Sequence, residues 1–328
     1  MKQTLMLLAA ASLLGALAPL PLRAAENKLG GYMFGDYYYN VTGPREKENG
    51  FWWRRIYLTD DLKWSDKVSG RFRLEANDIN VGQATRQPKD KLVPFVKESS
   101  LTYKSGSWVL SAGLTPTPTW GLAEKVWGYR CIEKTIIDLT GAGSPVDMGV
   151  QVTRKLGEKA DLSVMVGNGN GFRSEVDDNK KVYVQAHYKP GSLESRVYLD
   201  WQKQPKSMDQ LTLAVLLGLV KEGGQGAVEF YQRSAKKSAP GTGKDLKSFG
   251  VSLYATKKLS DSKKVFARAD LYEPNSDADK DRENLLIGGL DMELTKQVHL
   301  MPNVLVTLYQ DSGKDTQIVP RITGFFEF

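Results

Sequence analysis

Cysteine and histidine are scarce in this 328-residue sequence, which holds one cysteine, Cys131, and two histidines, His187 and His299. A single cysteine cannot form an internal disulfide, so no disulfide framework stabilises the fold. Neither histidine has a nearby serine or aspartate pattern for nucleophilic catalysis, and these three residues do not supply a zinc site. We therefore expect no metal, no cofactor and no enzymatic activity.

Long hydrophobic runs are also missing from the body of the chain. The longest uncharged apolar run there, Leu211–Val220, is much shorter than the roughly 20 apolar residues that a helix needs to cross a bilayer. Helical membrane proteins are thereby excluded. A membrane β-barrel is not, because a spanning strand shows lipid only every second residue and its hydropathy averages out.

The N-terminus has a different composition from the rest. Lys2 is followed by an apolar stretch from Leu5 to Leu20 and then by the small residues Ala24 and Ala25. This layout is typical of a secretory signal peptide, which we predict over residues 1–24, with the mature chain over 25–328. An N-terminal anchor helix is the alternative, but the sequence that follows is immediately strand-like.

The mature chain alternates between apolar and polar residues with a period of two, in segments bounded by Gly, Asp, Asn, Lys and Pro. In 193–202, for example, Val197, Leu199 and Trp201 share one face, while Arg196 and Asp200 share the other. We predict sixteen strands, at 28–39, 51–62, 67–79, 93–104, 107–115, 144–156, 160–168, 179–189, 193–202, 209–220, 226–233, 246–257, 263–273, 284–294, 298–309 and 317–328.

The connections between these strands alternate in length. Long loops near 40–50, 80–92 and 116–143 are separated by short links near 63–66 and 105–106, and the pattern continues to the end of the chain. Long loops on one side and tight turns on the other are typical of bacterial outer-membrane barrels. Aromatic residues gather toward the strand ends, as expected of the two belts at the membrane interfaces. The predicted fold class is all-β, an antiparallel up-and-down transmembrane barrel.

The last strand ends on Phe328 and alternates Ile318, Ile322 and Phe326 with Arg321 and Thr323. Together with the strand series, this terminal aromatic resembles the assembly signal of outer-membrane barrels. The whole mature chain resembles 16-stranded porins, a group that includes general and phosphate-selective porins. Three stretches look like segments of bacterial porin-like proteins, namely 113–118 (GLTPTP), 124–130 (EKVWGYR) and 146–150 (VDMGV).

The resemblance implies an outer-membrane location in a Gram-negative bacterium, a homotrimer, contact with membrane lipid and lipopolysaccharide, and recognition of Phe328 by the barrel-assembly machinery. It also implies that the third long loop, 116–143, folds into the lumen and narrows it. The alternative is an extracellular flap without a gating role. Cys131 lies in this loop, and we expect its thiol to be partly buried and to pack the loop against the wall.

Charged residues on this loop and on the predicted inner faces of the strands are the candidate pore-lining set. Arginine keeps its charge in a narrow channel, and rows of acids and bases set ion selectivity. The loop residues are Glu124, Lys125, Arg130, Glu133 and Lys134, and the wall residues are Arg55, Arg71, Arg73, Arg268 and Arg321. Because arginines cluster on the second and third strands, we expect a weak preference for anions. Plain ion pairs within the wall are the alternative for many of these residues.

The sequence therefore predicts a passive channel for small polar solutes or ions. The formal net charge of +7 fits a solvated rim that partly faces lipid phosphates, and we expect no nucleic-acid partner. Three alternatives stay open: a plugged structural or adhesive barrel, an outer-membrane hydrolase, and a soluble secreted β-protein.

Overall fold

The computed structural model describes residues 26–77, 92–175, 178–204, 208–239 and 241–328. The predicted signal peptide at 1–24 lies outside the described residues, as do the predicted strand positions 78 and 79 and almost all of the predicted loop 80–92. Within the described residues, no helix is long and apolar enough to cross a membrane.

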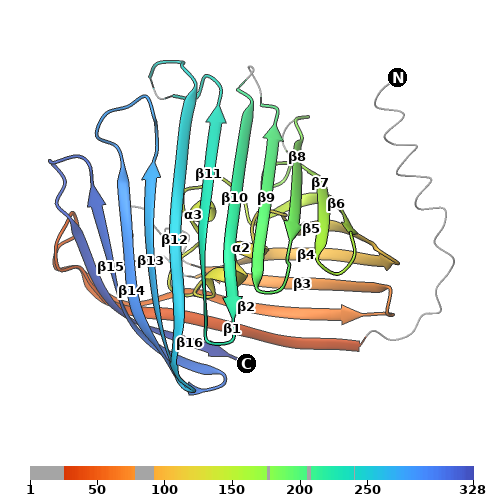
Figure 1. Ribbon diagram of the computed structural model, residues 1–328, viewed down its shortest axis with the longest axis horizontal. Coiled ribbons are helices and arrows are strands. Elements are labelled where there is room, and N and C mark those ends of the chain that lie inside the picture. Colours follow the sequence, from red (N-terminus) through yellow and green to blue (C-terminus); the bar gives the residue numbers. More distant parts are fainter. Residues whose placement is uncertain (1–25, 78–91, 176–177, 205–207, 240) are drawn as a thin grey trace.

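The described chain forms a single closed antiparallel barrel of sixteen strands (Figure 1). Each strand pairs with its neighbours in sequence, and β1 pairs with β16 from Tyr32 opposite Glu327 to Tyr38 opposite Arg321. The strands are β1 (Glu26–Tyr39), β2 (Asn49–Lys63), β3 (Val68–Asn77), β4 (Val93–Ser105), β5 (Trp108–Pro116), β6 (Val146–Lys155), β7 (Ala160–Gly167), β8 (Lys181–Tyr188), β9 (Leu193–Gln202), β10 (Gln210–Lys221), β11 (Gly224–Ala235), β12 (Leu246–Ser260), β13 (Lys263–Glu273), β14 (Glu283–Thr295), β15 (Val298–Tyr309) and β16 (Gln317–Glu327).

All sixteen predicted strands are confirmed, with corrections at their ends. β6 and β8 each begin two residues later than predicted, at Val146 and Lys181, whereas β11 begins two residues earlier, at Gly224. The early start of β11 follows from a very tight turn, in which Lys221 pairs directly with Gly224. A Cβ added to Gly224 would lie 2.4 Å from the carbonyl oxygen of Thr256, so the first residue of β11 has room only for glycine.

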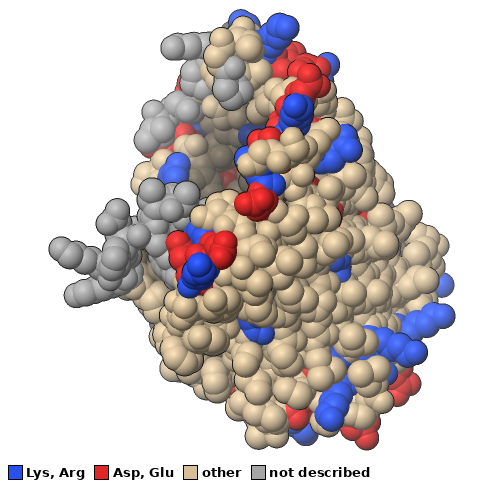
Figure 2. All heavy atoms as spheres, turned by 90° about the vertical axis from the view of Figure 1, so that its left-hand side faces the viewer, with Lys and Arg blue, Asp and Glu red and all other residues tan. Residues whose placement is uncertain are grey.

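The barrel wall has apolar side chains on its outer face and polar side chains on its inner face, the reverse of a soluble protein. On β9 the outward-facing side chains Val197 and Trp201 are 53% and 42% exposed, while the inward-facing Arg196 and Asp200 are 1% and 0% exposed. Figure 2 shows a broad outer surface nearly free of charge, with charged side chains gathered toward two of its edges. An apolar exterior around a polar interior is the pattern of a barrel that faces lipid.

Two β-bulges change this pattern at the inner wall. Between β1 and β2, Phe34 pairs with Arg55 and Gly35 with Trp53, so Arg54 is an extra residue. Between β3 and β4, Arg73 pairs with Glu98 and Leu74 with Val96, so Lys97 is an extra residue. A bulge opposes two residues to one and breaks the strict alternation of faces. Two consecutive charged side chains are consequently buried at each place, Arg54 beside Arg55 and Lys97 beside Glu98.

The connection between β5 and β6 contains the two described helices, α2 (Gly121–Trp127) and α3 (Ile136–Leu139). Helix α2 ends at Gly128, whose φ of 76° is left-handed and whose N–H donates to the carbonyl oxygen of Glu124. Glycine adopts this conformation without the strain that a Cβ would cause. The turn at Gly128 sends the chain from the helix toward Tyr129 and the wall.

We predict that a charge on the outer face in mid-wall destabilises the barrel strongly. Val197→Arg should lower the free energy of unfolding by about 2–4 kcal/mol, because the guanidinium would lie at the hydrocarbon level. The control Leu259→Arg, near the tight-turn end of β12, should cost only about 0–1 kcal/mol. Reversible urea unfolding in lipid vesicles measures both. Equal, small losses would mean that water covers this face.

Candidate functional site

The segment between β5 and β6, which is the predicted third loop, packs against the inner wall through a large apolar cluster. Trp127 at the end of α2 is fully buried and contacts Tyr254 of β12, with ring centroids 5.4 Å apart. Tyr129 stacks on Phe266 of β13 at 4.3 Å. Ile132 belongs to the same cluster. Burial of these large side chains is the main apolar stabilisation of the segment.

A second apolar cluster anchors the other half of the segment. Ile136 and Ile137 of α3 pack among the inward-facing residues Tyr183, Tyr198 and Tyr231 of β8, β9 and β11. The phenol of Tyr231 also forms a hydrogen bond of 2.7 Å with the hydroxyl of Thr140. Each tyrosine thus contributes an apolar ring to the cluster, and a polar tip that finds a partner.

Wall side chains donate hydrogen bonds to backbone carbonyls of the segment. Arg54 of β2 donates to the carbonyl of Ile132 at 2.8 Å, and Gln225 of β11 donates to that of Val126 at 2.7 Å. The carbonyls of Thr119 and Lys134 accept from Arg196 of β9 and Arg268 of β13 respectively. Buried carbonyls need such partners when no secondary structure provides them. These contacts hold the segment to inward-facing side chains of the wall, whereas folding of the loop across the lumen and constriction of the pore stay predictions.

Cys131 is buried, as expected from the sequence, and its Sγ lies 3.7 Å from Sδ of Met301 in β15. Burial raises the pKa of its thiol to about 12. The thiol is therefore protonated at neutral pH and is a poor nucleophile.

Glu75 of β3 is the centre of a buried charge cluster on the wall. Its carboxylate lies 3.3 Å from Arg55 of β2 and 2.9 Å from Lys97 of β4, and it accepts a hydrogen bond of 2.8 Å from Asn77. Burying a carboxylate away from water is costly unless it is paired and hydrogen-bonded. Two cations against one acid leave this part of the wall with an excess of positive charge.

The loop carries a charge cluster of its own. Arg130 lies 2.6 Å from Glu124 and 3.5 Å from Asp138, and Lys134 lies 3.8 Å from Asp138. Burial and the neighbouring Asp138 raise the pKa of Glu124 to about 7, although Arg130, Lys97 and Arg55 lower it. Lys125 is exposed, and in the described part of the chain it forms no ion pair.

A third charge cluster joins β1, β2 and β16. Asp36 lies 2.7 Å from Arg54 and 3.9 Å from Arg321. Glu133 of the loop accepts a hydrogen bond of 2.9 Å from its neighbour's backbone N–H. Burial raises the pKa of Glu133, but the charges of Arg321 and Arg54 outweigh it and the net shift is downward.

The remaining predicted wall residues lie in ordinary wall contacts. Arg71 forms a bidentate ion pair with Asp61, with hydrogen bonds of 2.6 and 3.0 Å. Arg73 donates a hydrogen bond of 2.8 Å to the hydroxyl of Thr59. Arg268 forms an ion pair with Asp270 on its own strand. The charge of Arg55 acts on the loop acid Glu124, whereas the charges of Arg321 and Arg268 act on the loop acid Glu133.

Sequence reasoning missed two inward-facing cations, Arg54 and Lys97. Strict alternation assigns each of them to the outer face, and only the bulges turn them inward. The available signal was a pair of consecutive charged residues inside an alternating strand, Arg54-Arg55 and Lys97-Glu98. Among the described residues, no group of three or more His, Cys, Asp or Glu side chains forms a candidate metal site.

Comparison with known proteins shows a shared fold without close sequence relatives. No protein-family model matches the sequence, and no curated protein matches it. An anion-selective porin from Comamonas acidovorans has a TM-score of 0.68 at 14% identity, covering 93% of this chain and 100% of that chain. The outer-membrane channel DcaP of Acinetobacter baumannii has a TM-score of 0.69 at 13% identity, covering 95% and 100%. Salmonella typhi OmpF, in a complex with daunomycin, has a TM-score of 0.68 at 10% identity, covering 93% and 98%.

These likenesses extend over nearly the whole of each chain. The protein accordingly has the fold of the outer-membrane porins, a closed 16-stranded antiparallel barrel.

We predict that removal of Trp127 releases the loop from the wall. Trp127→Ala should cost about 3–5 kcal/mol of loop packing and should open the chain to trypsin at Lys125, Arg130 and Lys134. The control Trp108→Ala, on the outer face of β5, should leave these sites protected. Fragment masses after limited proteolysis of folded protein report the result, and a wild-type loop that is cut equally fast would contradict the anchoring.

Proposed function

We propose that this protein is an outer-membrane channel for passive diffusion of small polar solutes and ions, and not an enzyme. The observation that carries the proposal is the inverted wall, apolar outside and charged inside, on a closed barrel of sixteen strands. A barrel of about this size encloses an aqueous channel when its lumen is not filled. The named channels that share the fold support the same function.

The passage is narrowest, in this proposal, between the third loop and the wall formed by β2 to β4. Glu124 and Arg130 belong to the loop, and Arg55 and Lys97 belong to the wall. The charges of Lys97 and Arg55 act on the pKa of Glu124, which supports their facing one another across a short distance. A solute in this gap would experience a field directed across the channel.

Weak anion preference is the selectivity that this arrangement favours. The two bulges each add a cation to the interior, Arg54 and Lys97, beyond those that strand alternation supplies. On the wall, Arg55 and Lys97 form ion pairs with the same acid, Glu75. The Comamonas porin that shares the fold is described as anion-selective, which is consistent with the proposal.

A plugged structural barrel is the second candidate. The observation that favours it is the pair of apolar clusters between the loop and the wall, which fill part of the interior. Channel and plug differ in whether folded protein conducts ions.

Location and assembly complete the proposal. Export would follow removal of residues 1–24, and the barrel would sit in the outer membrane as a homotrimer in contact with lipid and lipopolysaccharide. The backbone of Phe328 exchanges hydrogen bonds of 2.8 and 2.9 Å with Gly31 of β1. This position at the closing seam is consistent with a role for Phe328 in recognition by the assembly machinery.

We predict that removing the acid and removing a base of the Glu75 cluster shift the ion selectivity in opposite directions. Glu75→Gln should strengthen anion preference, because Arg55 and Lys97 then lack their acid, and Lys97→Gln should weaken it. The control Lys63→Gln, at the exposed rim beside Asp66, should change little. Reversal potentials in a planar bilayer under a salt gradient measure all three. Cation preference of the wild type would overturn the proposed selectivity.

We also predict that selectivity changes with pH near 7, where Glu124 titrates. Below that pH Glu124 is neutral and the gap loses one negative charge, so anion preference should be stronger there than at higher pH. Glu124→Gln should hold the channel at its low-pH value throughout. Glu46→Gln, in an exposed loop, is the control and should keep the step; a step that survives in Glu124→Gln would assign it to another group.

A further inference from the structure

Two sulfur atoms meet where the third loop touches β15. Cys131 Sγ, from the loop, lies 3.7 Å from Met301 Sδ, from the strand. Two sulfurs bound to one metal ion at about 2.3 Å, with a tetrahedral to trigonal angle, lie about 3.8–4.0 Å apart. The sulfurs are therefore already at nearly the separation that a shared metal ion requires.

A histidine lies beside this pair. His299 precedes Met301 by two positions on β15, so both side chains point to the inner face. Its Nδ1 is 2.7 Å from a carboxylate oxygen of Asp291, and Asp291 accepts a second hydrogen bond from the phenol of Tyr129 at 3.1 Å. A carboxylate accepts from Nδ1–H, which leaves the lone pair of Nε2 for a ligand. Metal-binding histidines are commonly held by a carboxylate in this way.

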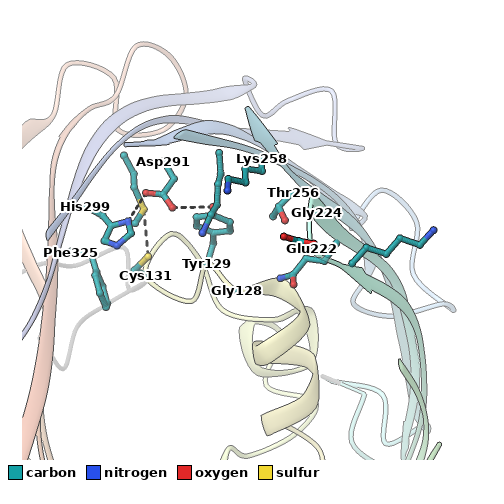
Figure 3. A pocket seen from close by; sticks show the side chains of 14 residues that line it. Gly128, Tyr129, Cys131, Glu222, Gly224, Thr256, Lys258, Asp291, His299 and Phe325 are labelled. Atoms are coloured by element: carbon teal, nitrogen blue, oxygen red, sulfur yellow. Dashed lines mark hydrogen bonds and ion pairs between the residues drawn. The ribbon is translucent and has the colours of Figure 1, made fainter. Parts of the chain in front are cut away.

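These side chains line one recess of about 350 Å³ at the tight-turn end of the loop–wall contact. Figure 3 shows the ring of His299 and the sulfur of Cys131 facing the same space, with Asp291 between His299 and Tyr129 and joined to both. Lys258 and Lys264 also line the recess. Through this opening an ion could reach the sulfurs, which a sealed core would prevent.

We propose that Cys131, Met301 and His299 form a binding site for a soft monovalent cation, Cu(I) or Ag(I). Thiolate and thioether sulfur prefer such ions over hard ions. On binding, a bond forms between Cys131 Sγ and the ion, and the thiol proton leaves to water. Thiolate and monovalent cation together carry no net charge, which suits a recess that is partly apolar and already bordered by lysines. Asp291 acts as a positioning residue for His299. The site does not depend on the proposed channel function.

The test uses refolded full-length protein under anaerobic conditions with ascorbate. Cu(I) is titrated against bathocuproine disulfonate, a chromophoric chelator. We expect one equivalent to be retained by the wild type and an affinity at least roughly 100-fold lower in Cys131→Ser and in Met301→Leu, because ligand loss exceeds the 10–100-fold typical of supporting residues. His299→Gln should also lower the affinity. Met165→Leu, a buried methionine in the other apolar cluster, is the matched control and should bind as the wild type does.

Met301→Leu keeps the thiol of Cys131. The variant therefore shows whether Cys131 alone binds the ion or whether the second sulfur is needed. Wild-type binding by this variant, or no retention of Cu(I) by folded wild type, would overturn the proposal. If Cys131→Ser does not fold, retention of Ag(I) after dialysis of folded protein decides instead. The wild type and Met165→Leu should each retain about one equivalent, and Met301→Leu much less. Equal retention by all three would overturn the site. Ion conductance is measured separately. A protein that conducts but does not bind Cu(I) would contradict only the metal site, and one that binds Cu(I) but does not conduct would contradict only the channel.

Discussion

Closure of the sheet is the constraint on which the rest of the molecule depends. Because β1 pairs with β16, every strand has two neighbours and no edge is left with unpaired backbone groups. Only then can the outer face be apolar without exposing backbone N–H and C=O groups to lipid. The polar and charged side chains must consequently lie inside, which is why the wall of this barrel is inverted relative to a soluble protein.

Charged side chains in the interior require hydrogen-bond or ion-pair partners. The loop between β5 and β6 provides some of these partners. Arg54 and Arg196 donate to its carbonyl groups, while Trp127 packs against Tyr254 of β12 and Tyr129 against Phe266 of β13. Apolar packing and these hydrogen bonds together hold the loop to the wall. The charges of Arg55 on β2 and Lys97 on β4 act on the loop acid Glu124, and the proposed constriction rests on this interaction.

The strands and their faces were predictable from the sequence, because alternation with a period of two is a local property. The inward positions of Arg55, Arg196 and Asp200 follow directly from it. Arg54 and Lys97 could not be found in this way, since a bulge depends on the register of the partner strand. The same holds for the contact of Trp127 with Tyr254, which joins residues far apart in the chain. Charge clusters such as that around Glu75 arise only when three strands are aligned.

The most direct test of a channel is the ion current through purified, refolded wild-type protein in a planar bilayer. Stepwise increases in current, each from one inserted barrel or assembly, are the predicted result. A protein shown to be folded and inserted that gives no steps would contradict the account, and would identify the loop between β5 and β6 as a plug.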